Sequence, residues 1–459
     1  PAAEPVPLPF TPTPVPTALR EPGRTRRFLS GLASLAAVLV IILIAVVLFT
    51  GRATHTGSTS GLSWTATESR LSDIAMVSPT EGWAIGATTT CYVYDANLET
   101  HYSNADCSHV DVVLMHYQQG VWSPVSLPVV GQLQSISMDS ATDGWAVGVS
   151  GDHGIESVLL HYDGQRWQEV PNQLGLDLTK VQMLSATDGW AMGMGGSEPG
   201  TSLLHYDGQS WTVQPWPAIP GIESNGEMII NDLEMTSPSD GWAAGSLPSI
   251  TSDPFQQEAL ILHYTGGQWT VSGTFQYGGL TSIAMASPTD GWAVGWQDAS
   301  TQTLVNGTPQ SVQDSGTPQS PIDRQKPLAL HYTDGEWQPV AVSFGTDPTM
   351  PWSFGQGRAW QVLLPSATDG WMLGPASGVL LHYNGTTWQL VHLPAPTIKN
   401  TLLALSGLDI LSPTEGWAVG EQEATRGCPV APPTDGGVEV CATPLLLHYQ
   451  HNAWTIYHP

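Results

Sequence analysis

Basic residues are scarce in this 459-residue chain. Lysine and arginine number 13, against 40 aspartates and glutamates. From Gly61 onward the chain keeps 8 basic and 38 acidic residues, a formal charge of 8 minus 38, or −30. A field of that sign repels nucleic-acid phosphates and anionic membrane surfaces. We therefore exclude nucleic acid as a partner and take the charge to serve solubility.

Cysteine is also rare. The chain has four, in two close pairs, Cys91 with Cys107 and Cys428 with Cys441. The even number predicts two disulfides if this part of the chain is exported. Local pairs are favoured, each closing a loop of about 15 residues for roughly 3 kcal/mol. Pairing between the two loops is the alternative, because the first and last repeat units would be neighbours in a closed ring. No CxxC spacing occurs, so a metal site is the weaker interpretation, and we expect no cofactor.

Long apolar runs are absent except for residues 28–51, which carry no charge. As a helix these residues would reach about 36 Å, enough to cross a hydrocarbon core of about 30 Å. The run is too long for a cleaved secretory signal, and no A-x-A-like site follows it. The arginines on its N-terminal side outnumber the single Arg52 beyond it, so the N-terminus is expected in the cytoplasm. Those flanking arginines are Arg20, Arg24, Arg26 and Arg27.

The chain then divides into four expected parts. Residues 1–27 form a Pro-rich cytoplasmic juxtamembrane segment, with eight prolines among the first 22 residues. Residues 28–51 are a transmembrane helix. Residues 52–70 are a tether, in which Trp64 could stand on a strand that helps close the following domain. Residues 71–459 form a repeat domain. These boundaries predict a single-pass protein of the cell membrane whose repeat domain is extracytoplasmic.

The repeat domain uses one unit seven times. A Gly-Trp pair in contexts such as SPTDGWAVG is followed by a His-Tyr pair, and a second tryptophan stands five residues after each tyrosine. The two tryptophan series alternate strictly and account for 14 of the 19 tryptophans. The first series is Trp83, Trp145, Trp190, Trp242, Trp292, Trp371 and Trp417. The second series is Trp122, Trp167, Trp211, Trp269, Trp337, Trp388 and Trp454.

Each unit predicts four short strands. The first has the pattern of LTSIAMAS at 280–287. A turn such as 288–291 follows, where we expect Gly291 to take the positive φ that closes a tight hairpin. The second strand is GWAVG, the third resembles LLLHY, and a turn such as Asp163-Gly164 leads to the fourth strand. No 3.6-residue periodicity follows the membrane segment, which excludes α-solenoids. The sequence thus predicts an all-β, seven-bladed β-propeller of four-stranded blades, preceded by one transmembrane α-helix.

The loops differ in how much they vary. The third-to-fourth turn has constant length, whereas the distance from the Gly-Trp tryptophan to the histidine runs from 11 residues in the sixth unit to 39 in the fifth. The connections between units vary as well. Because strands alternate in direction, both variable loops would lie on the same face. Binding residues concentrate on such loops when a rigid scaffold holds them.

The unit resembles a known family of propellers. GWAVG at 144–148 leading to LLHYDGQRW at 159–167 is similar to the repeat of Asp-box (BNR-like) propellers, especially the photosystem II stability/assembly factor type. The resemblance covers about residues 71–457. The stretch 161–167 departs from the box S/T-x-D-x-G-x-x-W because it is one residue tighter and lacks the leading hydroxyl, and unit four has Thr265-Gly266-Gly267 without an aspartate. Such boxes are structural turns in that family, so the resemblance implies a propeller and, by analogy alone, an assembly factor of a membrane complex.

The titratable residues of the repeat are interpreted as structural. A His-Tyr pair occurs in all seven units, whereas a functional site would occupy one or two, so we expect these side chains to be hydrogen-bonded within each blade. The carboxylates of the first turn are expected to cap it through the backbone. They are Glu81, Asp143, Asp188, Asp240, Asp290, Asp369 and Glu415.

An exported hydrolase is the competing class. A sialidase-like propeller needs an arginine cluster, and the chain beyond Arg52 offers five arginines, one of them in a short turn. These are Arg70, Arg166, Arg324, Arg358 and Arg426. A glycosidase would draw two carboxylates from the variable loops, which carry Asp253, Glu258 and Asp298. Nothing in the sequence pairs these acids, and no Ser-His-Asp order, phosphate-binding Gly loop or calcium loop occurs.

The sequence therefore favours a non-catalytic binding or sensing scaffold that takes a protein or carbohydrate through its long loops. The chain begins at Pro1 rather than at a methionine. A cytoplasmic domain ahead of it would make the propeller the sensor half of a signalling protein. The alternatives are a glycoside hydrolase-like or sialidase-like enzyme and an assembly factor.

Overall fold

The chain divides into two compact units, residues 1–48 and 49–459. The computed structural model describes residues of the second unit only. The described residues are 63–94, 105–127, 129, 131–150, 156–195, 200–216, 228–248, 257–276, 278–298, 304–305, 308–309, 325–342, 361–374, 378–396, 401–424 and 441–458. Within them no helix is long and apolar enough to cross a membrane. The predicted span 28–51 and the Pro-rich segment 1–27 lie outside this part of the chain.

The described strands form seven four-stranded antiparallel sheets, which confirms the predicted seven-bladed propeller. Blade one is β1 (Ser63–Ser78), β2 (Glu81–Tyr94), β3 (Ala105–Gln118) and β4 (Val121–Pro124). Blade two is β5 (Gln132–Ser140), β6 (Asp143–Ser150), β7 (Glu156–Tyr162) and β8 (Trp167–Glu169). Blade three is β9 (Leu176–Ser185), β10 (Asp188–Gly195), β11 (Thr201–Tyr206) and β12 (Trp211–Gln214). Blade four is β13 (Ile229–Ser237), β14 (Asp240–Leu247), β15 (Glu258–Thr265) and β16 (Gln268–Gln276).

The remaining blades follow the same order. Blade five is β17 (Gly278–Ser287), β18 (Asp290–Asp298), β21 (Gln325–Thr333) and β22 (Glu336–Pro339), with a two-stranded ribbon of β19 (Leu304–Val305) and β20 (Thr308–Pro309) between β18 and β21. Blade six is β23 (Gln361–Ser366), β24 (Asp369–Leu373), β25 (Leu380–Tyr383) and β26 (Trp388–Val391). Blade seven is β27 (Thr401–Ser412), β28 (Glu415–Ala424), β29 (Cys441–Gln450) and β30 (Ala453–Ile456).

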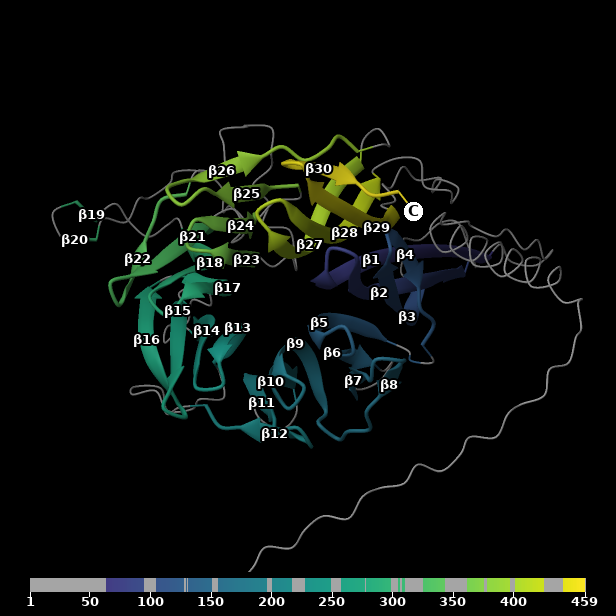
Figure 1. The fold of residues 1–459 in the computed structure, drawn as a ribbon, viewed down its shortest axis with the longest axis horizontal. Coiled ribbons are helices and arrows are strands. Elements are labelled where there is room, and N and C mark those ends of the chain that lie inside the picture. The colour runs from purple at the N-terminus through teal and green to yellow at the C-terminus, as the bar shows by residue number, and fades with distance from the viewer. Residues whose placement is uncertain are drawn as a thin grey trace, which may run out of the picture. The chain divides into compact units, whose positions relative to one another are not determined.

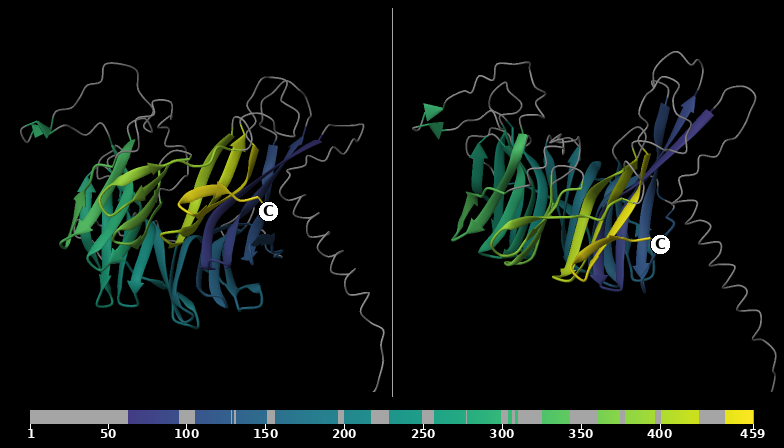
Figure 2. Two further views of the ribbon diagram at one scale, coloured as in Figure 1. Left: turned by 45° about the horizontal axis from the view of Figure 1, so that its top comes forward. Right: turned by 90° about the horizontal axis from the view of Figure 1, so that it is seen from above.

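The blades are arranged around a central axis, with the first strand of each innermost (Figure 1). Each inner strand contacts the inner strand of the next blade, and β27 of blade seven contacts β1 of blade one, so the ring is closed. Seen from the side, the strands run across the thickness of the ring (Figure 2). Every blade takes its four strands from one continuous stretch of chain, so no strand exchange links blade seven to blade one.

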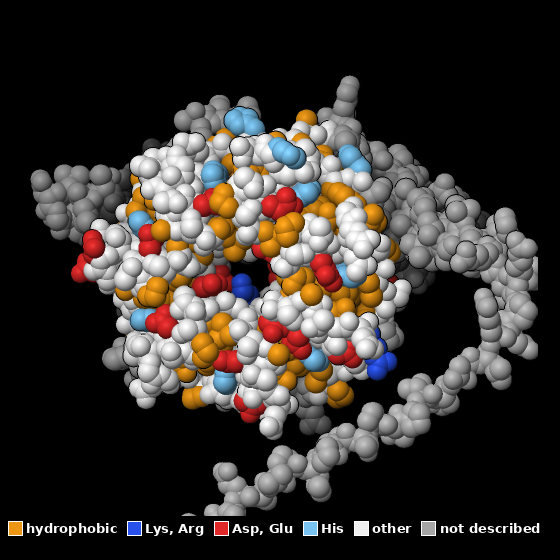
Figure 3. Space-filling view, viewed as in Figure 1, with side chains coloured by type: hydrophobic (Ala, Val, Ile, Leu, Met, Phe, Trp, Pro, Cys, Tyr) orange, Lys and Arg blue, Asp and Glu red, His pale blue; other side chains and the backbone are white. Residues whose placement is uncertain are grey.

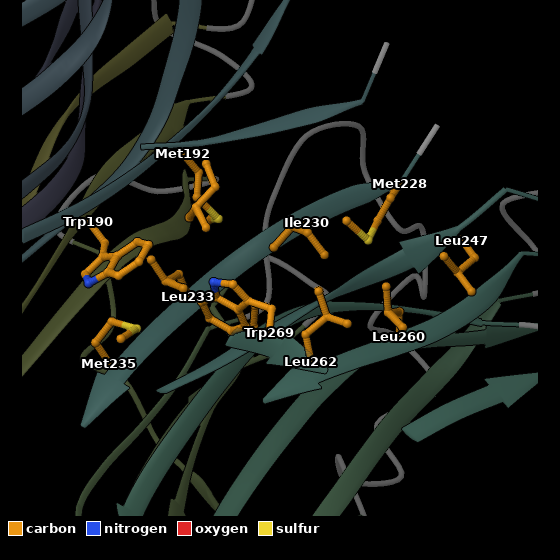
Figure 4. Close-up of a cluster of buried hydrophobic side chains, with 12 residues drawn as sticks. Trp190, Met192, Met228, Ile230, Leu233, Met235, Leu247, Leu260, Leu262 and Trp269 are labelled. Carbon is orange, nitrogen blue, oxygen red and sulfur yellow. The ribbon is translucent and has the colours of Figure 1, made fainter. Parts of the chain in front are cut away.

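The core consists of apolar clusters between neighbouring blades. The cluster between blades three and four joins Trp190 and Met192 of β10 to Leu233 of β13 and Trp269 of β16 (Figure 4). Strands buried on both faces explain why the sequence reads as near-continuous apolar runs. Burying one tryptophan removes 150–250 Å² from water, on the order of 4–6 kcal/mol as an upper bound.

The two tryptophan series meet at every joint. The Gly-Trp tryptophan of one blade lies edge-to-face against the second-series tryptophan of the next, for example Trp83 against Trp167 with ring centroids 5.4 Å apart. Trp417 of blade seven meets Trp122 of blade one in the same way at 5.5 Å. Among the described atoms none of the fourteen indole N–H groups of the two series has a hydrogen-bond partner. Burying an N–H group without a hydrogen-bond partner costs stability. Edge-to-face geometry turns the positive ring edge toward a negative aromatic face, which offsets part of this cost.

The role expected for Gly291 is wrong. The turn before β18 is Pro288-Thr289, and Gly291 lies in the strand without a positive φ. Its hydrogen leaves room for Met285, because a Cβ there would lie 2.2 Å from the Met285 sulfur. The left-handed conformation occurs instead in the third-to-fourth turn, where Gly164 has a φ of 83°.

The first strand of blade one is longer than expected. It begins at Ser63 rather than Leu71, and residues 63–70 pair with β2. Residues around Trp64 therefore extend blade one and do not add a strand to blade seven.

Side-chain contacts close the ring instead. The Asp409 carboxylate of β27 accepts a hydrogen bond of 2.6 Å from the Met76 N–H of β1. After β30, the Tyr457 hydroxyl donates a hydrogen bond to the Gly120 carbonyl at 3.0 Å and accepts one from the backbone N–H of Trp122 at 3.3 Å.

Candidate functional site

The two rims of the ring are built differently. One rim carries the turns between first and second strands and between third and fourth strands, which span two to four residues in every blade. The opposite rim carries the second-to-third loops and the connections between blades. The second-to-third loops range from five residues between β6 and β7 to sixteen between β28 and β29, and 26 residues separate β18 from β21. Strand direction thus puts all the unequal segments at one rim.

A histidine–carboxylate pair marks the short-turn rim in every blade. In blade two, His161 Nε2 lies 2.9 Å from the Asp143 carboxylate. The equivalent distances are 2.9 Å for His205–Asp188, 3.0 Å for His263–Asp240, 3.1 Å for His331–Asp290, 2.7 Å for His382–Asp369, 2.5 Å for His448–Glu415 and 3.6 Å for His116–Glu81. Figure 3 shows acidic and histidine side chains spread around this face of the ring.

These pairs correct the predicted role of the turn carboxylates. The carboxylates bind the histidines of the third strand, while the first turn is capped by a serine hydroxyl that accepts from an N–H two residues on, as Ser140 does from Thr142. Each histidine also lies against its own blade's Gly-Trp tryptophan, for example His116 on Trp83 at 4.0 Å. Burial lowers the pKa of His116, although the nearby Glu81 carboxylate opposes this. Six of the seven histidines are thus hydrogen-bonded within their own blade, as expected, and His116 lies 3.6 Å from Glu81.

Blade two carries one more carboxyl, Asp139, beside Asp143. Burial raises the pKa of Asp139, and the charge of Asp143 raises it further. The Asp143 Oδ1 atom is buried, and no described donor reaches it.

The inner strands form a polar belt around the axis. Six of them contain a β-bulge one residue after the strand's apolar anchor, as between Leu71 and Asp73 in β1. A bulge re-aims the side chain that follows it. In four joints the side chain of that residue accepts a backbone N–H of the next blade. The bonds are Ile136 N–H to Asp73 at 3.0 Å, Val181 N–H to Ser135 at 3.3 Å, Ile283 N–H to Asp232 at 3.0 Å and Val362 N–H to Ser282 at 3.2 Å.

Blade three places a lysine at this position. Lys180 Nζ lies 2.9 Å from Asp232 Oδ1 of blade four. Burial alone would lower the pKa of Lys180, but the charges of Asp232 and Asp73 outweigh it and raise the pKa. Burial raises the pKa of Asp73, against the charge of Lys180 and the N–H groups of Ile136 and Ile74.

Two further carboxyls belong to this charged cluster. Burial raises the pKa of Glu234, in β13, to about 7, with Lys180 opposing and Asp232 adding to the shift. Burial raises the pKa of Asp409, in β27, to about 6, against the Met76 N–H and with the charge of Asp73 adding to the shift. The axial cluster therefore consists of Asp73, Lys180, Asp232, Glu234 and Asp409. It can hold or release protons near neutral pH, because two of its carboxyls titrate there.

The described residues contain no group of three or more His, Cys, Asp or Glu side chains that could hold a metal. The other predicted site residues fall in different places. All fourteen repeat tryptophans lie at the joints between blades, as the aromatic contacts above require. The backbones of Cys91, Cys107 and Cys441 lie in β2, β3 and β29. Their side chains, and all of Cys428, lie outside the described residues, so the disulfides stay a prediction. Asp253 and the Asp298 side chain also lie outside the described residues, whereas Glu258 is the first residue of β15.

Sequence reasoning missed the axial cluster. Asp73, Lys180 and Asp232 precede the aliphatic residue that recurs in the first strand, at the position where blades two and five have Ser135 and Ser282. Glu234 and Asp409 follow that aliphatic residue. In a single repeat these look like ordinary polar substitutions. They become one site only when the ring brings seven inner strands to a common axis.

No family model matches the chain, and no curated protein matches it. Several solved structures are similar in fold. One is YCF48 bound to D1 peptide, at 13% identity, with 87% of this chain and 97% of that chain covered and a TM-score of 0.46. A second is the fucose-specific lectin from Aleuria aurantia, at 10% identity, with 71% and 94% covered and a TM-score of 0.38. A third is the β-propeller domain of the Trilobed protease from Pyrococcus furiosus, which has an open velcro topology, at 8% identity, with 85% and 96% covered and a TM-score of 0.44.

Proposed function

We propose that this chain is a membrane-anchored, extracytoplasmic scaffold that binds a protein or carbohydrate without chemical conversion. The observation that carries the proposal is the inequality of the two rims. One rim repeats the same turn and the same histidine–carboxylate pair in each blade. The other bears segments of five to 26 residues between second and third strands. A ligand that must be distinguished from others needs a surface that differs from blade to blade, and only the second rim provides it.

The net charge of the chain limits the kinds of partner that it can bind. With a formal charge of −30 beyond Gly61, the propeller attracts cationic surfaces, tolerates neutral ones and repels polyanions. The membrane anchor at 28–51, with the N-terminus in the cytoplasm, is part of the same proposal and rests on the uncharged length of that segment and its flanking arginines. The repeat histidines and turn carboxylates already bind one another, which supports a role in structure over catalysis.

Loop replacement tests the proposal. Binding of the full chain to glycan and peptide arrays is compared with that of a variant. In the variant, residues 299–324 are replaced by the five-residue blade-two segment 151–155. This segment contains no cysteine, so the predicted disulfides are unaffected. The control is Pro288→Ala, in the short first turn of blade five. Blade two has an alanine, Ala141, at the same position of its turn. We expect loop replacement to weaken binding at least tenfold and the control to leave it unchanged.

Two outcomes contradict the proposal. Binding that depends on the short turn and not on the loop would assign function to the other rim. Release of sugar from an arrayed glycan, abolished in Glu258→Gln, would favour a glycosidase. The anchor is tested separately, by protease protection in sealed vesicles. Protection of the propeller in right-side-out vesicles would refute the proposed topology.

A further inference from the structure

The outer edge of blade four differs from that of every other blade. Its outermost strand, β16, spans nine residues, whereas the described outermost strands of the other blades span three or four. All of β16 pairs with β15, from Thr265 opposite Gln268 to Glu258 opposite Gln276. Figure 1 shows it as a long strand at the periphery of the ring.

The extra residues of β16 lie beyond the point at which the fourth strand of other blades stops pairing with the third strand. In blades one, two, five and seven the residue three places after the second-series tryptophan makes a last backbone hydrogen bond to the third strand, as Val170 does to Leu159 at 2.8 Å. In blades two and three, side chains then cover the third strand, Asn172 at Ser157 and Trp216 at Thr201. In blade four the pairing of β16 with β15 continues through Gly273–Gln276. The side of β16 that does not pair with β15 therefore forms a long outer edge of the blade.

This edge lacks most of the protection that natural edge strands carry. The sequence QWTVSGTFQ has no charge and no proline. A single register shift beside Val271 bends it. Val271 is 40% exposed, and Thr270, Ser272, Thr274 and Gln276 are exposed as well. Long edges without lysine, proline or inward charges present unpaired N–H and C=O groups to another chain.

We propose that β16 is a self-association edge, which pairs antiparallel with β16 of a second copy of this chain. Charge argues for this occupant. The chain carries 38 acidic residues beyond Gly61, so most approaches of two copies bring carboxylates together. Along β16 any antiparallel register sets only neutral side chains opposite one another. Pairing of one strand with itself is isologous and closes as a two-fold dimer, without growth into fibres.

Repeat symmetry provides a matched control. Val271 and Val213 stand two residues after the second-series tryptophans of blades four and three, and pair with Leu262 and Leu204. Val213 is 59% exposed, so it is at least as accessible as Val271. It lies on the four-residue β12.

The test measures the mass of the full chain in mild detergent over a dilution series, by analytical ultracentrifugation. We expect a concentration-dependent dimer. Val271→Lys and Thr274→Lys each set two lysines at the two-fold interface, and each should raise the dimer Kd at least about 100-fold. Val213→Lys should dimerise as the unmodified chain does.

A monomer at every concentration of the unmodified chain overturns the proposal, as does a dimer that both β16 variants leave intact. Equal loss of dimer in Val213→Lys would also overturn it, because a general charge effect would then explain the result. Thermal melts of each variant confirm folding. If a lysine variant melts early, Thr274→Glu repeats the test with the opposite charge.

Discussion

Glu234 lies on the inner strand β13, where the axial cluster surrounds it, and replacing it with glutamine should reshape the pH dependence of folding. Burial raises its pKa from 4.5 to about 7 in the folded chain. Between these two values the folded state keeps a proton that the unfolded state releases. Stability therefore falls as pH rises through this window, and it is constant above pH 7 and below pH 4.5 as far as this group is concerned.

The magnitude follows from the two pKa values. At about 1.4 kcal/mol per pH unit, Glu234 costs about 3 kcal/mol of stability at high pH, relative to acid. Glutamine has the same shape and no charge, so Glu234→Gln should match the unmodified chain near pH 4 and exceed its stability by about 3 kcal/mol at pH 8. Lys180 keeps its bond to Asp232 in this variant.

Urea unfolding at half-unit pH intervals measures this difference. Glu169→Gln, at an exposed position of β8, is the control and should give a difference that does not vary with pH. Asp409→Asn should show a similar gain over a more acidic window, from 3.8 to about 6. Parallel stability curves for the unmodified chain and Glu234→Gln would refute the reasoning, since they would mean that Glu234 is as well solvated in the ring as in the unfolded chain.

Three further predictions concern the backbone, the closing joint and the cysteines. Gly295→Ala would put a Cβ 2.0 Å from the Gly279 carbonyl oxygen and should cost about 3 kcal/mol or more in urea unfolding, whereas Gly273→Ala meets only the Phe275 ring at 3.3 Å and should cost under about 1 kcal/mol. Equal costs would contradict the packing argument. Tyr457→Phe removes the hydroxyl that joins the C-terminal segment to Gly120 and Trp122, and should lower stability by about 1 kcal/mol and speed hydrogen exchange in β1 and β27 first. Uniform exchange would argue against a weak joint there. Peptide mapping without reductant should recover Cys91 linked to Cys107, whose backbones lie between the paired positions Thr90–His109 and Tyr92–Asp106 of neighbouring strands. A Cys91–Cys428 or Cys91–Cys441 peptide would instead favour the cross-blade alternative.

The repeat carried most of the fold prediction. Two tryptophans per unit, a constant five-residue spacing from tyrosine to tryptophan, and apolar strands are all local features. Each unit therefore specifies its own four-stranded sheet, and seven such sheets can bury their faces only against each other. For the same reason the second series was placed correctly on the fourth strand, and the turn at Asp163-Gly164 was placed correctly between the third and fourth strands.

Errors arose where the decisive contact crosses the hairpin or the blade. Gly291 looked like a turn residue because a turn precedes it, but the Met285 side chain on the paired strand is what excludes a Cβ. Asp290 looked like a turn cap, but it binds His331, 41 residues away. Distance along the chain hides such partners from a local pattern.

The sequence by itself determined the blade, the number of blades and the rim that differs among them, because these follow from spacing and periodicity within about fifty residues. Only the tertiary structure decided what meets at the axis and at the closing joint. Asp73 and Asp409 lie 336 positions apart in the chain, yet their charges interact where blade seven meets blade one. A ring brings the first and last units together, and the raised pKa values of the inner carboxyls result from that shared, enclosed axis.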